Sequence, residues 1–352
     1  MRTALALFLL WVSTGAAAPE PTIRAEALVA DAAKGYPGMR AVVVGASGRL
    51  FASSQGLADV EAKRPVESST RFRIYSAVKP MTAAAALRLA REGKLDLDAP
   101  IGRYLSGLPP ALAPITARQL ATHTSGIRHY NKGEAVTTSP CRRVSDALPA
   151  FQNDPLLFPP GRREAYSSYG YVLLSAVVEA ASGQPFEQSM RRLVFEPAGM
   201  TETELDDSSR SIPQRAHPYE TGPDGGWMDY PADPTCKWGA GGFLSTADDM
   251  ARFGRALIEG KIVPKQDLPS LWTPARTAEG TSDFGLGWST AGTDGGRLVA
   301  VQSGGNVGGR SVLVLDPDSG IVVAMTANLE GPRMIAPAKE LVDLFAGARA
   351  KD

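Results

Sequence analysis

The sequence has few residues of the kinds that bind transition metals. It contains only two cysteines, Cys141 and Cys236, and three histidines, His123, His129 and His217. No CxxC or HExxH spacing occurs, and the histidines are too scattered to predict a zinc site. We therefore expect no metal and no organic cofactor. A G-x-S-x-G elbow is also absent, which argues against the α/β-hydrolase route to a serine nucleophile.

An excess of charge of either sign is also missing. The chain has 37 Lys and Arg against 37 Asp and Glu, and its formal net charge is +0. Because the sequence has no basic tract, nucleic acid is not an expected partner. Hydrophobic residues make up 43% of the chain and charged residues 21%. This balance is typical of a compact globular enzyme rather than a disordered chain.

Long apolar runs are absent except near the start of the chain. Residues 1–18 combine Arg2, an apolar stretch over 4–12 and a small-residue end at 16–18. This pattern predicts a secretory signal peptide cleaved after Ala17 or Ala18, although an uncleaved membrane anchor is the alternative. The apolar stretch is too short to span a bilayer, and we expect no stable membrane insertion after cleavage. The mature protein is expected to be exported, either periplasmic or secreted.

Both cysteines lie in the part of the chain that would be exported. In an oxidising compartment, an even pair such as Cys141 and Cys236 predicts one disulfide. Two buried free thiols are the alternative reading of the same pair. The sequence alone does not decide between them.

Strand patterns gather at the two ends of the chain. Runs rich in β-branched and apolar residues, separated by Gly, Asp and Pro turns, cover residues 40–46, 50–54, 297–302, 311–315 and 321–326. Helices are expected at 21–34, 80–91, 169–181, 247–259 and 334–345. The pattern predicts an α+β domain over 19–352, with an antiparallel sheet built from both chain ends and flanked by helices. Its sheet lobe would comprise about 19–75 and 261–352, and an inserted helical lobe about 76–260.

The most informative pair of residues is Ser76 and Lys79, at the start of the helix expected over 80–91. Their spacing puts both side chains on one helix face, one turn apart. A serine hydroxyl is a poor nucleophile unless a base lies within hydrogen-bond reach, and a lysine amine can supply one. An N-cap serine followed by a solvated lysine is the alternative explanation.

Further segments decide between these explanations. The tetrapeptide is followed in order by Tyr166-Ser167-Ser168, by a glycine-rich stretch from Trp238 to Thr246, and by Gln302-Ser303-Gly304-Gly305. Taken singly, Tyr166 would be a core aromatic, Trp238 a packing residue and His123 a hydrogen-bonding loop residue. His129 and Tyr130 could line a substrate cleft.

Together these motifs resemble the serine β-lactamase and penicillin-binding-protein-like family, on its class C side. Within that family, the chain is most similar to the branch of the mitochondrial serine β-lactamase-like protein and its bacterial relatives. The similarity extends from about residue 29 to about 344, with the motifs in the same order. It rests on residues 72–79, 93–100, 123–130, 166–171 and 237–246.

The resemblance implies a role for each motif. Ser76 would be the acylated nucleophile, Lys79 would take its proton, and Tyr166 would serve as general base and acid. A protonated Lys79 would push Tyr166 toward the phenolate. The backbone N–H groups of Ser76 and Gly305 would form the oxyanion hole. The remaining positions, Ser168, Gln302, Ser303 and Gly304, would bind substrate.

Two positions depart from the family pattern. Ser168 stands where Asn is usual, and Gln302 stands where the family carries Lys or His. Because Gln302 is neutral, a preference for substrates with a free carboxylate is not expected. We expect a serine hydrolase that cleaves a peptide, amide or ester through an acyl-serine, with a small-molecule substrate as its partner. A true β-lactamase or D,D-peptidase, or a non-catalytic acyl-binding scaffold, are the alternatives.

Overall fold

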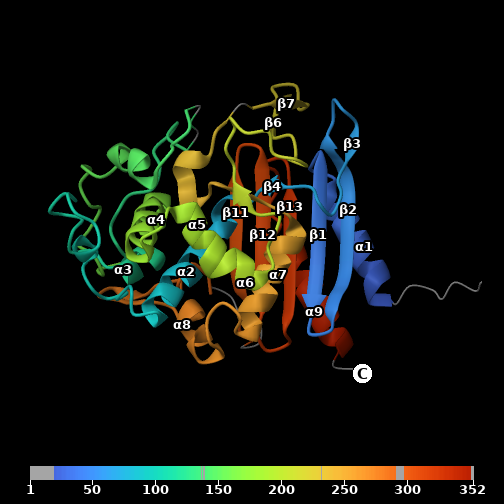
Figure 1. Cartoon of the computed structure of the whole chain (residues 1–352). Helices are drawn as coiled ribbons and strands as arrows, with labels where there is room; N and C mark the ends of the chain where they lie inside the picture. Colours follow the sequence, from blue (N-terminus) through green and yellow to red (C-terminus); the bar gives the residue numbers. More distant parts are fainter. Residues whose placement is uncertain (1–19, 136, 138, 231, 291–296, 350–352) are drawn as a thin grey trace, which may run out of the picture.

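The computed structural model describes residues 20–135, 137, 139–230, 232–290 and 297–349. Their centre is an antiparallel sheet with the strand order β11-β12-β13-β1-β2-β3 (Figure 1). The strands come from both ends of the chain, which confirms the expected α+β architecture. Their bounds are β1 Gly38–Gly45, β2 Gly48–Asp59, β3 Arg64–Pro65, β11 Ala300–Asn306, β12 Gly309–Asp316 and β13 Ile321–Ala327.

Both faces of the sheet are buried, because alternate residues of each central strand pack into two different cores. In β1, Val43 packs with helices α1 (Glu20–Ala33) and α9 (Ile335–Arg349) on one face. Its neighbour Val42 packs on the opposite face, where α7 (Ala247–Glu259) lies. This double burial explains why the strands are nearly continuous apolar runs. Although α7 falls within the range expected for the helical lobe, it packs directly on β1 and β13.

Most of the other helices lie beside the sheet, on the side where β11 forms its edge, whereas the short helix α6 (Glu196–Ala198) packs against α7 (Figure 1). The helices beside the sheet are α2 Lys79–Arg91, α3 Ala117–Ala121, α4 Ser168–Ser182, α5 Phe186–Met190 and α8 Leu268–Trp272. Three small sheets complete the structure: β4 Phe72–Arg73 with β8 Phe243–Ser245 and β5 Glu204–Leu205, β6 Tyr219–Thr221 with β7 Trp227–Asp229, and β9 Arg276–Thr277 with β10 Gly280–Thr281.

The expected helices and strands are present, and the bounds of one strand differ from the prediction. The strand expected over 297–302 is β11, Ala300–Asn306, and it includes Gly304 and Gly305. Glycine pairs usually indicate a turn, but here the hairpin turn follows at Val307 and Gly308, where Gly308 has a φ of 77°. The expected signal peptide, residues 1–18, lies outside the described residues. In the part of the chain that the structure describes, no helix has both the length and the apolar character needed to cross a bilayer.

Candidate active site

Ser76 lies in a short 3-10 helix, Tyr75–Val78, that leads directly into α2. The preceding residue, Tyr75, has a φ of 44°, a conformation that is rare for a residue with a side chain. Tyr75 is held there because its ring is buried and its hydroxyl donates to the carbonyl of Val307, in the β11–β12 turn. This turn of the chain places the half-buried Ser76 against the edge strand of the sheet.

The side chain of Lys79 contacts that of Ser76, as their one-turn spacing predicts. Its Nζ is 2.9 Å from Ser76 Oγ, 3.2 Å from Ser168 Oγ and 2.7 Å from the carbonyl oxygen of Ala240. The side chain is completely buried, and this burial lowers the pKa of Lys79 well below its ordinary value. A neutral amine beside a serine hydroxyl can accept that hydroxyl's proton.

Tyr166 completes the group from the segment just before α4. Its hydroxyl is 2.8 Å from Ser76 Oγ, and Lys79 Nζ lies 5.0 Å from the centre of its ring. Burial raises the pKa of Tyr166, while hydrogen bonds with Ser76, Ser168 and Gln302 oppose that rise. The shift is therefore opposite to the expected one toward phenolate, because burial of the Tyr166 side chain itself disfavours the charged phenolate.

Two histidines support this tyrosine. The Nδ1 atom of His123 accepts from the backbone N–H of Ser167, and that of His129 accepts from Ser168, each at 3.1 Å. Their rings lie 4.3 and 5.4 Å from the ring of Tyr166. Burial, with Lys79 adding to it, lowers the pKa of both, to about 4 for His129. Both imidazoles are thus neutral acceptors that position the tyrosine segment.

The direction of the backbone groups of β11 follows from one pair of hydrogen bonds. Val301 exchanges both backbone bonds with Ser289, which lies outside the sheet, at 3.0 and 2.9 Å. In an antiparallel strand these groups alternate in direction, so Ser303 and Gly305 point their N–H and C=O groups to the same open side. The N–H of Gly305 is thereby directed out of the sheet edge, as an oxyanion donor requires.

Gly304 shows how closely this edge approaches Ser76. A Cβ added to Gly304 would lie 2.1 Å from the carbonyl oxygen of Ile74 and 2.8 Å from the amide nitrogen of Ser76. Real Cβ atoms do not make such contacts, so only glycine permits this approach. The strand and the nucleophile thus lie against each other.

Gln302 points to the face of the sheet that carries the helical core. It is 5% exposed, and its Nε2 donates to the carbonyl of Ser303 at 3.1 Å. The side chain is therefore a neutral hydrogen-bonding group next to Tyr166. The structure thus brings all the residues selected from the sequence for catalysis and substrate binding to one place, while their roles in catalysis stay predictions.

Cys141 and Cys236 form a disulfide, with Cα atoms 4.9 Å apart. Cys236 lies in the 3-10 segment Thr235–Ala240, which contains the carbonyl that accepts from Lys79. No role for Ala240 was predicted, because a backbone acceptor leaves no residue-type signal in the sequence. The disulfide fixes the segment that supplies this acceptor.

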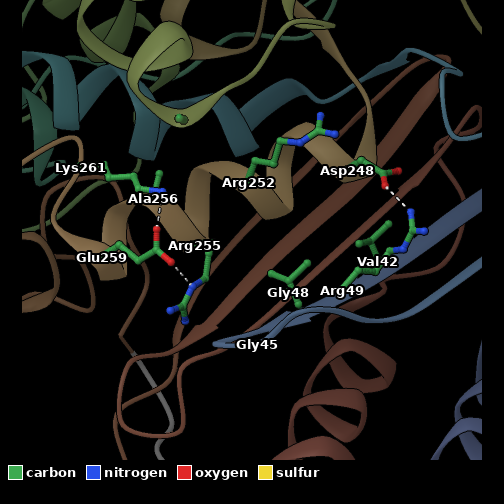
Figure 2. Close-up of a pocket in the computed structure, with 12 residues that line it drawn as sticks. Val42, Gly45, Gly48, Arg49, Asp248, Arg252, Arg255, Ala256, Glu259 and Lys261 are labelled. Carbon is green, nitrogen blue, oxygen red and sulfur yellow. Dashed lines mark hydrogen bonds and ion pairs between the residues drawn. The ribbon is translucent and has the colours of Figure 1, made fainter.

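A cavity of about 300 Å³ lies elsewhere, between α7 and the β1–β2 hairpin (Figure 2). Its charged groups all have ion-pair partners. Glu259 binds Arg255 and Lys261, each at 2.7 Å, and Asp248 lies 3.7 Å from Arg49. Arg252 pairs with Asp249, which lies outside the cavity lining. None of the residues of the Ser76 group lines it. It therefore takes no part in the candidate active site.

Comparison with known proteins identifies the family. The family model described as Beta-lactamase matches residues 25–347. The chain belongs to the Beta-lactamase family. The human serine beta-lactamase-like protein LACTB, mitochondrial, is 27% identical over 408 residues, which cover 84% of this chain and 74% of that protein.

Other members of the Beta-lactamase family extend this comparison. The esterase EstB of Burkholderia gladioli is 38% identical over 167 residues, covering 43% of this chain and 42% of the esterase. The crystal structure of a penicillin-binding protein from Bacillus halodurans superposes with a TM-score of 0.74 at 29% identity, covering 89% and 95% of the two chains. The chain is thus a serine hydrolase of the Beta-lactamase family.

Proposed function

We propose that this protein cleaves peptide, amide or ester bonds through an acyl-Ser76 intermediate. The observation that supports this most directly is the position of Ser76 Oγ, 2.9 Å from Lys79 Nζ and 2.8 Å from the hydroxyl of Tyr166. A base and an acid on either side of one nucleophile are what acyl transfer needs.

In the acylation step, Ser76 Oγ attacks the carbonyl carbon and its proton passes to the neutral amine of Lys79. The N–H groups of Ser76 and Gly305 stabilise the oxyanion that forms, and one such donor is typically worth about 3 kcal/mol. Tyr166 donates its proton to the leaving oxygen or nitrogen, which breaks the scissile bond. Ser168, 3.2 Å from Lys79 Nζ, offers a path by which that proton is replaced.

In the deacylation step, a water molecule attacks the ester of Ser76. Lys79 takes the proton of the water, and Ser76 Oγ leaves and takes a proton back from Lys79. The products are the free acid and the original enzyme. The cycle thus uses Ser76, Lys79, Tyr166, the two backbone donors and the proton path through Ser168.

We propose that the substrate carries no carboxylate at the end that meets Gln302. A neutral amide at this position cannot form the ion pair with a carboxylate that a lysine or a protonated histidine would form. Similarity to the esterase EstB supports an ester substrate. Similarity to a penicillin-binding protein supports a second candidate, β-lactam hydrolysis or D,D-peptidase activity, which turnover of a chromogenic cephalosporin tests.

We also propose that the protein is exported. The signal-like pattern of residues 1–18 supports this, and so does the Cys141–Cys236 disulfide, since such bonds persist mainly in oxidising compartments. N-terminal sequencing of the protein recovered from its native host should find a mature chain that begins at Ala18 or Pro19. A chain that still begins at Met1 would contradict the proposal.

Labelling with a fluorophosphonate probe tests the central proposal. The probe should modify the wild-type protein, and peptide mass spectrometry should place the adduct on Ser76. The Ser76→Ala variant should not be labelled. The control variant Ser209→Ala, which removes a serine distant from Lys79 in the sequence, should be labelled like the wild type. An adduct on Ser168 or Ser303 instead would show that the nucleophile is assigned wrongly.

A further inference from the structure

Three side chains of types that bind metals lie close together where the β6–β7 hairpin meets the connection between β2 and β3. They are separate from the residues of the proposed reaction. The cluster consists of Glu61, His217 and Asp229, each of which offers one ligand atom, and these atoms all lie within 4.8 Å of one another. Glu61 lies between β2 and β3, His217 precedes β6, and Asp229 ends β7 (Figure 1). Three separate segments thus direct side chains to one point.

A buried tyrosine fixes this arrangement. The hydroxyl of Tyr219, a completely buried residue, accepts from the backbone N–H of Val60 at 2.8 Å and donates to the carboxylate of Glu61. The backbone N–H of His217 donates to the carbonyl of Ala58 at 2.7 Å, and Tyr219 pairs with Asp229 across the hairpin. Glu61 therefore has the supporting hydrogen bond that metal-ligating carboxylates typically have, and backbone hydrogen bonds hold the segments of His217 and Asp229 beside it.

The charges of the cluster are not balanced by lysine or arginine. Within the described part of the chain, neither Glu61 nor Asp229 forms an ion pair with either residue type; Asp229 contacts only the imidazole of His217, at 2.5 Å. A divalent cation would neutralise the two carboxylates, because opposite charge at short range favours their ionised form.

We propose that Glu61, His217 and Asp229 bind a zinc ion, with water in the remaining position. One imidazole and two carboxylates suit Zn²⁺ better than Ca²⁺, which takes oxygen ligands only. Zinc binds such atoms at about 2.0–2.2 Å, so its ligands lie roughly 3.3–3.5 Å apart. The side chains reach that spacing by small rotations, and Glu61 and Asp229 are exposed enough to make them.

This site has a structural consequence that is independent of the proposed reaction. A zinc ion would join the β6–β7 hairpin to the end of β2, two parts of the chain that are about 160 residues apart in sequence. The proposed site also differs from the expectation of no metal. The three histidines are indeed scattered, but a site with one histidine and two carboxylates leaves no spacing signal in the sequence.

Titration of the metal-free protein with Zn²⁺ tests the proposal. After dialysis against EDTA, calorimetry should show one equivalent bound, and zinc at a hundredfold excess over Kd should raise the Tm by roughly 3 °C. His217→Gln should remove both effects. Glu220→Gln is the matched control, since it removes one charge from the same hairpin outside the cluster, and it should bind zinc like the wild type.

The same experiment defines the outcomes that overturn the proposal. No zinc bound by the wild type would overturn it, and so would unchanged zinc binding by a folded His217→Gln variant. Equal binding of Ca²⁺ by the wild type and by His217→Gln would indicate a purely acidic cluster instead. Fluorophosphonate labelling of Ser76 should be the same in His217→Gln and the wild type, so failure of the zinc site is distinguishable from failure of the proposed reaction.

Discussion

Replacing Lys79 with methionine tests the proposed base through two independent measurements. Methionine has a similar length, fits a completely buried position and cannot accept a proton. Loss of a general base typically costs about 10²- to 10⁴-fold in rate. We therefore expect kcat/KM for a p-nitrophenyl ester to fall by at least about 10²-fold. The wild-type rate should rise with pH as Lys79 loses its proton and should fall when Tyr166 ionises. The rate of the variant should lack the rise that is due to Lys79.

The second measurement is the pH dependence of stability. The pKa of Lys79 is lowered by burial in the folded protein and ordinary, near 10.5, in the unfolded chain. Between these two values the unfolded chain holds a proton that the folded protein lacks, so folding becomes more favourable as the pH rises. The contribution is about 1.4 kcal/mol for each pH unit in that window. Lys79→Met should lose it.

Urea denaturation of the wild type and Lys79→Met at several pH values measures this difference. The wild type should gain stability relative to the variant as the pH rises, up to the ordinary lysine pKa. Against this, methionine leaves the carbonyl of Ala240 without its donor, which costs about 1–3 kcal/mol at every pH. A pH-independent stability difference, or wild-type turnover in a folded variant, would refute a neutral Lys79 base.

Two further predictions concern other parts of the site. Gln302→His should improve kcat/KM for a carboxylate-bearing substrate relative to its matched neutral ester by about tenfold, or 1–2 kcal/mol, because it adds a charge-assisted hydrogen bond. An unchanged ratio of the two kcat/KM values would mean that residue 302 does not contact the charged group of the substrate. Replacing Cys141 and Cys236 together with serine should lower the free energy of unfolding by about 4–5 kcal/mol, since the bridge spans 95 residues. Urea denaturation measures this loss, and two free thiols titrated in the unreduced wild type would show that no bridge forms.

Features that depend on neighbouring residues could be predicted from the sequence. The contact between Ser76 and Lys79 is one of them, because a helical turn brings residues three apart onto one face whatever the rest of the chain does. The strands at both chain ends were likewise recognisable, since Gly and Asp-Pro turns separate them. The end of β11 was misplaced, because Gly304 and Gly305 look like a turn when their neighbours are unknown.

The sequence by itself determined the candidate nucleophile, its neighbouring amine, the tyrosine motif and the order in which they follow one another. Only the tertiary structure decided the direction in which the pKa values of Lys79 and Tyr166 shift. Burial depends on every element packed around Lys79 and Tyr166, and it reversed the phenolate expected from their proximity. Contacts between distant segments, such as Ala240 with Lys79, depend on backbone atoms that every residue type carries, so no sequence pattern records them.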